Sequence, residues 1–485
     1  MPSLRREIRF WLNDQLVQRD TCSPCETLLD FLRIEQRLTG SKEGCAEGDC
    51  GACTVLVGRL MKGTLVYETV NACIRFLPSL DGCHIVTIEA LKGEAEALHP
   101  VQQAMVDHHG SQCGFCTPGI VMSLYALWMQ TPNPGREAVE VALQGNLCRC
   151  TGYRPIIDAA MAISQYGNPA SDWLAREREA NLARLLDLKD GARVVIEKDG
   201  ERAILPASLA DFATVRMEEP EATIIAGNTD VGLWVTKQLK RLSTVLFINH
   251  LEELKDIHAT EDSLFIGAGV TYTEAAGAIA EHFPHLNDFW LRIAGPQIRN
   301  MGTIGGNIAN GSPIGDLPPV LIALGAELIL RRGSNQRCLP LERFFIDYGQ
   351  QDRAAGDFVE IIRIPTLDET SLCSAYKISK RRDEDISSVS AGFCLDVTDG
   401  VITRARIAFG GMAGVPKRAS AAEKALKGKP FALDTLLAAA KRLPDDFKPL
   451  SDGRASDAYR MKVAQNLFRR FWLEHTVSEE GVAAE

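Results

Sequence analysis

Long hydrophobic runs are absent from this sequence of 485 residues. No stretch of 18 apolar residues occurs, and the most apolar segment, 317–330, is interrupted by Pro318, Pro319 and Glu327. A helix that spans a bilayer needs about 20 consecutive apolar residues, so we expect no membrane segment. Residues 1–20 lack the apolar core of a secretory signal, and the expected compartment is therefore the cytoplasm.

Positive charge is also in short supply. The chain has 53 Lys and Arg residues against 63 Asp and Glu residues, for a net charge of −10. Proteins that bind nucleic acids usually carry a basic surface, so we expect no nucleic-acid partner. Internal repeats and low-complexity tracts are missing too, and the composition is that of an ordinary globular protein. At roughly 150 residues per domain, the length predicts about three or four domains.

The order of strand and helix signals predicts an α+β protein of several domains. The predicted parts are a strand-rich domain over 1–85, a helical domain over 86–165, a linker with a surface helix over 166–202, a mixed domain over 203–366 and a second mixed domain over 371–476. Helices in the second part are expected to begin at Pro100, Pro118 and Pro155, because proline is favoured in the first helical turn.

Cysteine is the residue type that is plentiful. Eleven of the fourteen cysteines lie in the first 150 residues. Structural disulfides are disfavoured in a reducing compartment, so this clustering indicates metal binding.

The first cysteine set has the spacing C-x4-C-x2-C followed by a distant fourth cysteine. Its members are Cys45, Cys50, Cys53 and Cys73. This is the spacing of plant-type [2Fe–2S] sites, whereas zinc usually takes paired short spacings. The nearby glycines are Gly44, Gly48 and Gly51. Glycine allows the backbone to come close to a cluster and to point N–H groups at its sulfurs. We therefore predict a [2Fe–2S] cluster here.

The second cysteine set combines a C-x2-C pair with a C-x-C pair. Its members are Cys113, Cys116, Cys148 and Cys150. Both pairs fall in predicted turns at helix ends. The spacing by itself leaves both a [2Fe–2S] cluster and a zinc ion open.

Two glycine-rich stretches, 224–232 and 302–310, are candidates for binding a cofactor. Neither has the G-x-G-x-x-G pattern of dinucleotide-binding folds, and Gly267-Ala268-Gly269 begins that pattern without completing it. Loops of Gly, Asn and Thr can surround a pyrophosphate with N–H groups. Tight turns between strands have the same composition, so these stretches leave both readings open.

Three cysteine motifs, at 44–53, 112–119 and 145–153, resemble the iron–sulfur domains of the xanthine oxidase family. The resemblance extends over nearly the whole chain, including 298–317 and 409–418. It is particularly strong with the small subunits of bacterial xanthine dehydrogenases. It implies that the second set also holds [2Fe–2S]. The implied fold is a β-grasp ferredoxin domain, a helical [2Fe–2S] domain, an FAD-binding domain of vanillyl-alcohol-oxidase type and a C-terminal α+β flavoprotein domain.

The same resemblance implies an FAD site. Its implied residues are Gly227, Asn228, Thr229 and Asp230 at the pyrophosphate, Thr303, Gly306 and Asn307 at the phosphates and ribitol, Asp316 at the adenosine ribose, Val359 at the adenine and Lys377 as a counter-charge to phosphate. Ile293 stands where animal members place a phenylalanine against the flavin ring.

The resemblance also implies a function. The chain would pass electrons from a molybdopterin centre on a large partner subunit, through two [2Fe–2S] clusters and FAD, to NAD, in support of the oxidation of hypoxanthine and xanthine to urate. No residue for substrate hydroxylation is expected on this chain, and the expected assembly is a heterotetramer of two small and two large subunits. NAD is expected near Tyr348 and 380–385. The alternatives are a subunit of another molybdenum hydroxylase, acting on aldehydes or heteroaromatics, and a free-standing redox carrier.

The remaining cysteines fall outside these motifs. Cys22 and Cys25 form a C-x2-C pair that the family pattern does not need, and ordinary packing is expected for them. The isolated residues Cys83, Cys338, Cys373 and Cys394 are likewise expected to be buried packing residues.

Overall fold

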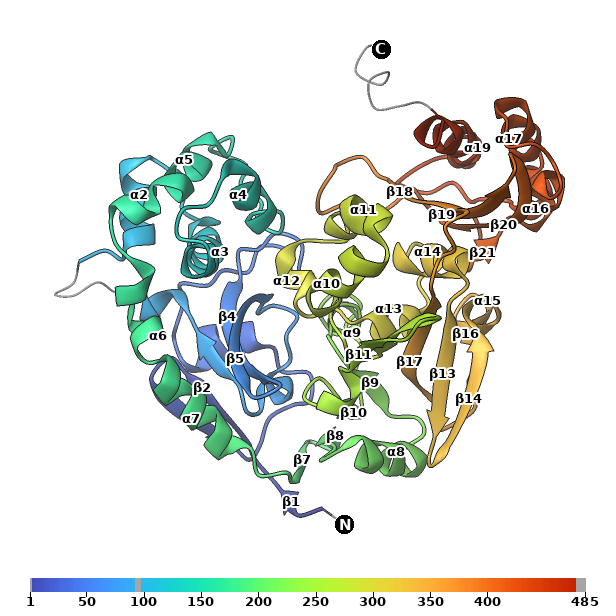
Figure 1. Cartoon of the computed structure of the whole chain (residues 1–485). Coiled ribbons are helices and arrows are strands. Elements are labelled where there is room, and N and C mark those ends of the chain that lie inside the picture. Colours follow the sequence, from blue (N-terminus) through green and yellow to red (C-terminus); the bar gives the residue numbers. More distant parts are fainter. Residues whose placement is uncertain (1, 92–96, 477–485) are drawn as a thin grey trace. The chain divides into compact units, whose positions relative to one another are not determined.

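The computed structural model describes residues 2–91 and 97–476, which form two compact units (Figure 1). Among the described residues, unit 1 comprises 2–91, 97–253, 271–273 and 294–303, and unit 2 comprises 254–270, 274–293 and 304–476. No helix in the described part of the chain has the length and apolar character needed to cross a membrane. The expected multidomain α+β architecture is confirmed.

Unit 1 begins with a β-grasp ferredoxin sheet, as expected. Its strands follow the order β3-β2-β6-β4-β5, with β2 parallel to β6 and antiparallel to β3. The elements are β2 (Ile8–Leu12), β3 (Gln15–Arg19), α1 (Leu28–Asp30) with a π turn over Phe31–Glu35, β4 (Thr54–Met61), β5 (Thr64–Asn71) and β6 (His84–Val86). Thr27 caps α1 by accepting the Asp30 N–H. This capping places Leu28 and Phe31 against Phe10 in the buried core.

The helical part of unit 1 surrounds a second core built on Tyr125, Trp128 and Ile156. Its helices are α2 (Pro100–Asp107), α3 (Thr117–Gln130), α4 (Arg136–Ala142) and α5 (Arg154–Ala162). The prolines expected in first turns lie there in α2, α3 and α5. The next helices are α6 (Trp173–Arg176) and α7 (Arg178–Leu188). Leu185 and Leu188 are buried in the same core, so the helix expected on the surface has one side packed inside.

A second sheet completes unit 1, with strand order β1-β7-β8-β10-β9. Its elements are β1 (Leu4–Arg5), β7 (Arg193–Lys198), β8 (Glu201–Leu205), α8 (Leu209–Glu218), β9 (Thr223–Ile225), α9 (Val231–Thr236), β10 (Thr244–Phe247) and α12 (Pro296–Arg299). β1 pairs in parallel with β7, with Leu4 opposite Arg193. The first residues of the chain therefore belong to this sheet rather than to the ferredoxin sheet that follows them.

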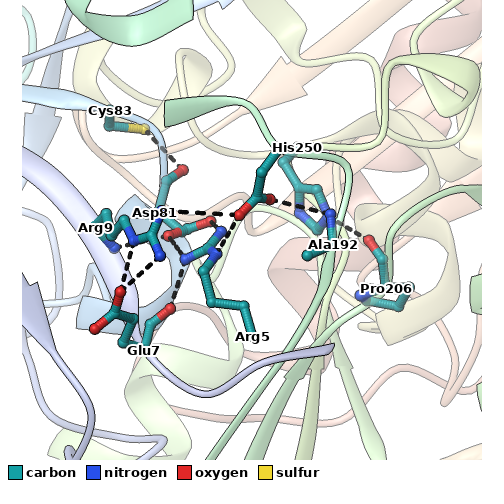
Figure 2. A network of polar contacts seen from close by, with 9 residues as sticks. Arg5, Glu7, Arg9, Asp81, Cys83, Ala192, Pro206 and His250 are labelled. Atoms are coloured by element: carbon teal, nitrogen blue, oxygen red, sulfur yellow. Dashed lines mark hydrogen bonds and ion pairs between the residues drawn. The ribbon is translucent and has the colours of Figure 1, made fainter. Parts of the chain in front are cut away.

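A buried arginine fixes that arrangement (Figure 2). The Arg5 guanidinium is 8% exposed and donates to both carboxylate oxygens of Asp81, at 2.9 and 2.8 Å, and to Asp190 at 2.8 Å. Burial opposes the charge, but Asp81 and Asp190 outweigh it and raise the pKa of Arg5 above its usual value. Asp81 also accepts the backbone N–H of Arg9, and Asp190 that of Ala192. Arg5 thus joins residues of the ferredoxin domain to the segment that leads into β7.

Unit 2 contains an antiparallel sheet with strand order β11-β12-β17-β13-β14. Its elements are β11 (Ile257–Ala259), β12 (Ser263–Gly267), most of α10 (Tyr272–His282), α11 (Asn287–Leu291), α13 (Ile304–Asn310), α14 (Leu317–Leu324), β13 (Glu327–Arg332), β14 (Asn335–Pro340), α15 (Leu341–Phe344), β15 (Phe345–Asp347), β16 (Gln350–Gln351) and β17 (Phe358–Pro365). Short 3-10 turns across the chain cover Leu77–Leu80, Ile88–Ala90, Ile163–Gln165, Pro169–Ser171, Glu252–Leu254 and Pro284–Leu286.

The C-terminal part of unit 2 is a sheet with order β18-β19-β20-β21 between two layers of helix. Its elements are β18 (Ser371–Ile378), β19 (Val389–Thr398), β20 (Val401–Gly410), β21 (Lys417–Arg418), α16 (Ser420–Leu426), α17 (Leu433–Ala440), α18 (Leu443–Asp446) and α19 (Asp457–Glu474). Phe393 packs on Phe468 and Phe471 of α19. Gly392, on the opposite face, lies against α14: a Cβ there would be 2.7 Å from the Val320 Cα.

Candidate cofactor sites

The first cysteine set converges in unit 1. Cys45, Cys50 and Cys53 lie in the loop before β4, and Cys73 follows β5. Hydrogen bonds from the Cys50 and Cys73 thiols lower the pKa of Cys45 well below its usual value, and a bond from Cys73 lowers that of Cys53. The four sulfurs therefore lie close together, as [2Fe–2S] ligation requires.

Backbone and amide donors surround these sulfurs. The N–H groups of Asp49 and Cys50 point at the Cys45 Sγ, at 3.3 and 3.4 Å, and the Asn71 Nδ2 lies 3.9 Å from the Cys53 Sγ. Donors of this kind stabilise thiolates and help to set the reduction potential of a bound cluster. The loop predicted from its glycines thus fits the cofactor.

The second cysteine set lies in two turns before helices. Cys113 and Cys116 precede α3, and Cys148 and Cys150 precede α5. The sulfurs approach in pairs: Cys113 lies 3.6 Å from Cys150, and Cys116 donates to Cys148. The Thr151 hydroxyl lies 3.2 Å from the Cys148 Sγ. Within the described ranges, no three His, Cys, Asp or Glu side chains are grouped as ligands of one metal ion.

The loops of the two sets touch each other. The Leu147 N–H donates to the Cys50 carbonyl at 3.0 Å, and the Asn146 Nδ2 donates to the Gly51 carbonyl at 3.2 Å. Gln297 Nε2 binds the Asn146 Oδ1 at 3.0 Å from the other side. Sequence reasoning missed Asn146 and Gln297, although Asn146 lies inside a recognised motif. These contacts hold one cluster loop directly against the other.

Replacing Gly51 with alanine is expected to remove the iron bound by the first cysteine set and to displace the loop around Gly145. Gly51 has a φ of +69°, and a Cβ there would lie 2.0 Å from the Gly145 carbonyl oxygen. Gly63→Ala is the matched control, because Gly63 has a φ of +80° but nothing within 4 Å of its Cβ position. Both changes carry the backbone cost of about 1–2 kcal/mol, and only Gly51 adds the clash. Iron content per chain measures the difference, and full iron in Gly51→Ala would contradict the close approach of the loops.

Five of the residues implied for FAD lie in unit 1. They are Gly227, Asn228, Thr229, Asp230 and Thr303. The 226–230 loop joins β9 to α9 and packs tightly on the backbone of 301–302, since a Cβ on Gly227 would lie 1.9 Å from the Met301 carbonyl oxygen. Thr303 is buried and pairs with Thr271. Within this unit, the structure thus brings the first predicted glycine-rich stretch against 302–303, the start of the second.

Asn228 is the most informative residue of that loop. It has a φ of +66° and is 4% exposed, and its Nδ2 donates to the Ile74 carbonyl beside Cys73. Its Oδ1 is buried without a hydrogen-bond partner in the described structure. A buried polar atom without a partner is costly, so this oxygen fits a ligand donor such as a hydroxyl. Asp230 directly precedes α9, and desolvation raises the pKa of its carboxyl.

The other five implied residues lie in unit 2. They are Gly306, Asn307, Asp316, Val359 and Lys377. Asn307 lies on α13, and its buried Oδ1 also lacks a hydrogen-bond partner among the described residues. Val359 is buried in β17 opposite Leu330. Each of these features is compatible with a bound nucleotide.

Asp316 and Lys377 contact each other. The Lys377 Nζ donates to one Asp316 oxygen at 2.5 Å, and the Ser387 hydroxyl donates to the other at 2.5 Å. Both oxygens of the carboxylate are thus engaged, and an adenosine ribose would share them. Sequence reasoning missed Ser387, which lies in a run of serines and carries no motif. The Arg292 guanidinium binds the Lys377 carbonyl at 2.8 Å and fixes this strand end.

The remaining predicted positions are distributed over unit 2. Ile293 is buried at 6% exposure after α11, and Tyr348 is 74% exposed in the turn between β15 and β16. The 380–385 loop is tied internally, since Asp385 accepts the Arg381 N–H at 2.8 Å. Arg382 also pairs with Asp288 at 3.0 Å.

The cysteines outside the two sets bring two corrections. Cys22 and Cys83 are buried as expected, and burial raises the pKa of Cys22 and of Cys25 to about 12. Cys338 is exposed, because it lies on the edge strand β14. Cys373 and Cys394 are buried but not isolated: strand pairing brings their sulfurs to 2.6 Å. The expectation of a buried residue was therefore wrong for Cys338, and the expectation of isolated residues was wrong for Cys373 and Cys394.

Family comparisons match the same three regions. Residues 87–161 match a [2Fe-2S] binding domain, residues 199–367 match the FAD binding domain in molybdopterin dehydrogenase, and residues 374–475 match the CO dehydrogenase flavoprotein C-terminal domain. Together with the converging cysteines, these matches define an iron–sulfur flavoprotein. More particularly, the chain is homologous to xanthine dehydrogenases and carries the [2Fe–2S] and FAD domains of a molybdenum hydroxylase.

Individual relatives of the chain are also molybdenum hydroxylases. The chain is 33% identical, over 96% of its length, to the xanthine dehydrogenase of Emericella nidulans, and 31% identical, over 84%, to the xanthine dehydrogenase/oxidase of Rattus norvegicus. It spans only 38% and 34% of those proteins. Among solved structures, CO dehydrogenase from Oligotropha carboxidovorans matches 55% of this chain and 94% of its own (TM-score 0.52, 28% identity). Quinoline 2-oxidoreductase from Pseudomonas putida matches 56% and 94% (TM-score 0.52, 26% identity).

Proposed function

We propose that this chain is the electron-transfer subunit of a xanthine dehydrogenase. In this proposal it receives electrons from a molybdopterin centre on a large partner subunit and delivers them to NAD, in support of the oxidation of hypoxanthine and xanthine to urate. Two small and two large subunits would form the complex, in the cytoplasm. The eight cysteines and the ten flavin residues described above are the proposed cofactor ligands and contacts.

The observation that carries the proposal is a continuous set of contacts within unit 1. The Leu147–Cys50 hydrogen bond joins the loop of Cys148 to that of the first set. The Asn228 side chain then joins the residue after Cys73 to the predicted pyrophosphate loop. Electron transfer depends on short distances between centres, and these contacts support the order second set, first set, flavin.

Each part of the chain has a distinct task in this proposal. When bound, the [2Fe–2S] clusters supply one-electron transfer, and FAD couples it to the two-electron chemistry of NAD. The Asp49 and Cys50 N–H groups stabilise negative charge on the Cys45 sulfur. Asn146 and Gln297 hold the two loops in register, and Lys377 places a positive charge beside Asp316.

The choice of xanthine among the family's substrates has support from coverage. The xanthine dehydrogenases match 83–98% of this chain, across its iron–sulfur and flavin parts. The CO dehydrogenase and quinoline oxidoreductase chains match only 55–57% of it. A chain with both parts fused favours xanthine dehydrogenase over another molybdenum hydroxylase. Purification with the large subunit, followed by turnover assays on xanthine, an aldehyde and quinoline, tests the choice.

The chain without its partner is expected to reduce an artificial dye with NADH and to have no activity on xanthine. NADH oxidation needs only the flavin and a place for nicotinamide, which we assign near Tyr348. Tyr348→Ala should therefore raise the KM for NADH several-fold. Tyr459→Ala is the matched control, since Tyr459 is also exposed, at 50%, on α19. An FAD-loaded chain that reduced no dye with NADH would indicate another terminal acceptor or a free-standing carrier.

A further inference from the structure

Two buried cysteines of unit 2 lie opposite each other on neighbouring strands. Cys373 of β18 and Cys394 of β19 are direct partners in the antiparallel register. Directly opposed residues of such strands have Cα atoms about 4.5 or 5.5 Å apart. Both separations fall within the range of about 4.4–6.8 Å found across disulfides. The backbone therefore already has the geometry that a disulfide needs.

The side chains point at each other. The Cys373 thiol donates a hydrogen bond to the Cys394 sulfur at 2.6 Å, so the two sulfurs need little movement to bond. Cys373 is 6% exposed and Cys394 is 2% exposed. This pair lies on the face of the sheet that includes Gly392 and is covered by α14. Only a small molecule can reach it in the folded protein.

The surroundings favour chemistry on the Cys394 sulfur. The hydrogen bond to Cys394, together with burial, holds the pKa of Cys373 above its usual value, so Cys373 keeps its proton. Arg404, which pairs with Asp396 at 2.5 Å, lies close enough to the two cysteines to interact electrostatically with the pair. A guanidinium nearby stabilises a thiolate, which is the form that attacks oxidants.

We propose that Cys373 and Cys394 are a redox-active pair that peroxide converts to a reversible disulfide joining β18 to β19. The Cys394 sulfur attacks one peroxide oxygen, the O–O bond breaks, and a sulfenic acid and water form. The Cys373 sulfur then displaces the sulfenic hydroxyl, which leaves as water with the Cys373 proton. In sum, two thiols and one hydrogen peroxide give one disulfide and two waters. A dithiol such as dithiothreitol reverses the change by exchange.

The disulfide would fasten the strand that carries Lys377. Cys373 and Lys377 are four residues apart on β18, so their side chains lie on the same face of the sheet. Cross-linking β18 to β19 at Cys373 restricts the unfolded chain and holds the strand register at Lys377. Oxidation is therefore expected to raise the midpoint of thermal unfolding of this domain, independently of the substrate of any partner subunit.

Peptide mapping tests the proposal directly. The cofactor-loaded chain is treated with dilute hydrogen peroxide. It is then unfolded in the presence of iodoacetamide, which alkylates free thiols, and digested with trypsin. Peptides 364–377 and 383–404 each contain one cysteine, Cys373 and Cys394 respectively. We expect a cross-linked species of their summed mass less two hydrogens, its loss on dithiothreitol treatment, and a higher unfolding midpoint in the oxidised sample.

Two variants complete the experiment. Cys373→Ser should abolish both the cross-link and the shift in midpoint, whereas Cys338→Ser, which removes an exposed cysteine of the same unit, should retain both. Oxidation of the exposed Cys338 shows that the peroxide treatment was effective. If both peptides from such a sample carried alkylated, unlinked cysteines, the proposal would be overturned. A cross-link without any change in the midpoint would overturn its stabilising role.

Discussion

Replacement of Cys148 by alanine is expected to lower the iron content from about four atoms per chain to about two, because each [2Fe–2S] cluster holds two irons on four thiolates. Cys148 is 8% exposed, and its sulfur contacts both Cys116 and Thr151. The neighbouring cysteine of that turn, Cys150, already belongs to the set and cannot replace it. One of the two cluster signals in electron paramagnetic resonance should disappear with the iron.

The same variant should separate the two half-reactions of the proposed enzyme. In the complex with the large subunit, reduction of FAD by xanthine is expected to be abolished, because the second set is the proposed entry point for electrons. Dye reduction by NADH should continue, since it needs only the flavin. Stopped-flow absorbance of the flavin measures the first reaction, and a steady-state assay measures the second.

The matched control is Cys22→Ala, which removes a buried sulfur that belongs to neither set. It should keep about four irons and both reactions. Reduction of FAD by xanthine at the normal rate in Cys148→Ala would disprove the proposed order. Two irons and one zinc in the unaltered chain would disprove the assignment of the second set.

Replacement of Asp316 by alanine is expected to have the largest effect in unit 2. The Lys377 side chain is 2% exposed and would lose its carboxylate partner. An ammonium left unpaired inside a protein costs about 3–5 kcal/mol. The variant should therefore unfold at a lower temperature and also lose FAD, because Asp316 is the proposed contact of the adenosine ribose.

A neutral pair separates these two effects. Asp316→Asn combined with Lys377→Met keeps the approximate volume and leaves no buried charge, so most of the stability should return. FAD retention should return only in part, since the proposed ribose acceptor and counter-charge to phosphate are both gone. Differential scanning calorimetry and the FAD content after gel filtration give the two readouts. Full FAD retention in the double variant would remove both residues from the proposed site.

Local patterns predicted most of the iron–sulfur part. Three ligands of the first set fall within nine residues, and the prolines that open α2, α3 and α5 are local helix signals. A loop that surrounds a cluster needs glycines at certain positions, and these can be recognised in the sequence. Gly51, for example, has a positive φ. Such features depend on neighbours in the chain, so they can be read before the fold is known.

Features that depend on register between distant strands could not be read in this way. The pairing of Cys373 with Cys394 requires β18 and β19 to align at one register, and a shift by one residue would separate the two sulfurs. The contact of Ser387 with Asp316 spans 71 residues. The flavin loops were found through a family resemblance, since their composition also suits ordinary turns.

The pairing of β1 with β7 has a consequence for how this protein can be divided. The sequence suggests separate domains, with a boundary in the segment that contains α6 and α7. Its first strand, however, contributes to a sheet whose other strands begin at Arg193, and Arg5 holds that connection through Asp81 and Asp190. If the gene were split at this boundary, one product would contain β1 without its partner β7, and the other would contain the sheet with the edge of β7 unpaired. Domain shuffling at this point therefore has to carry the first five residues along or replace them.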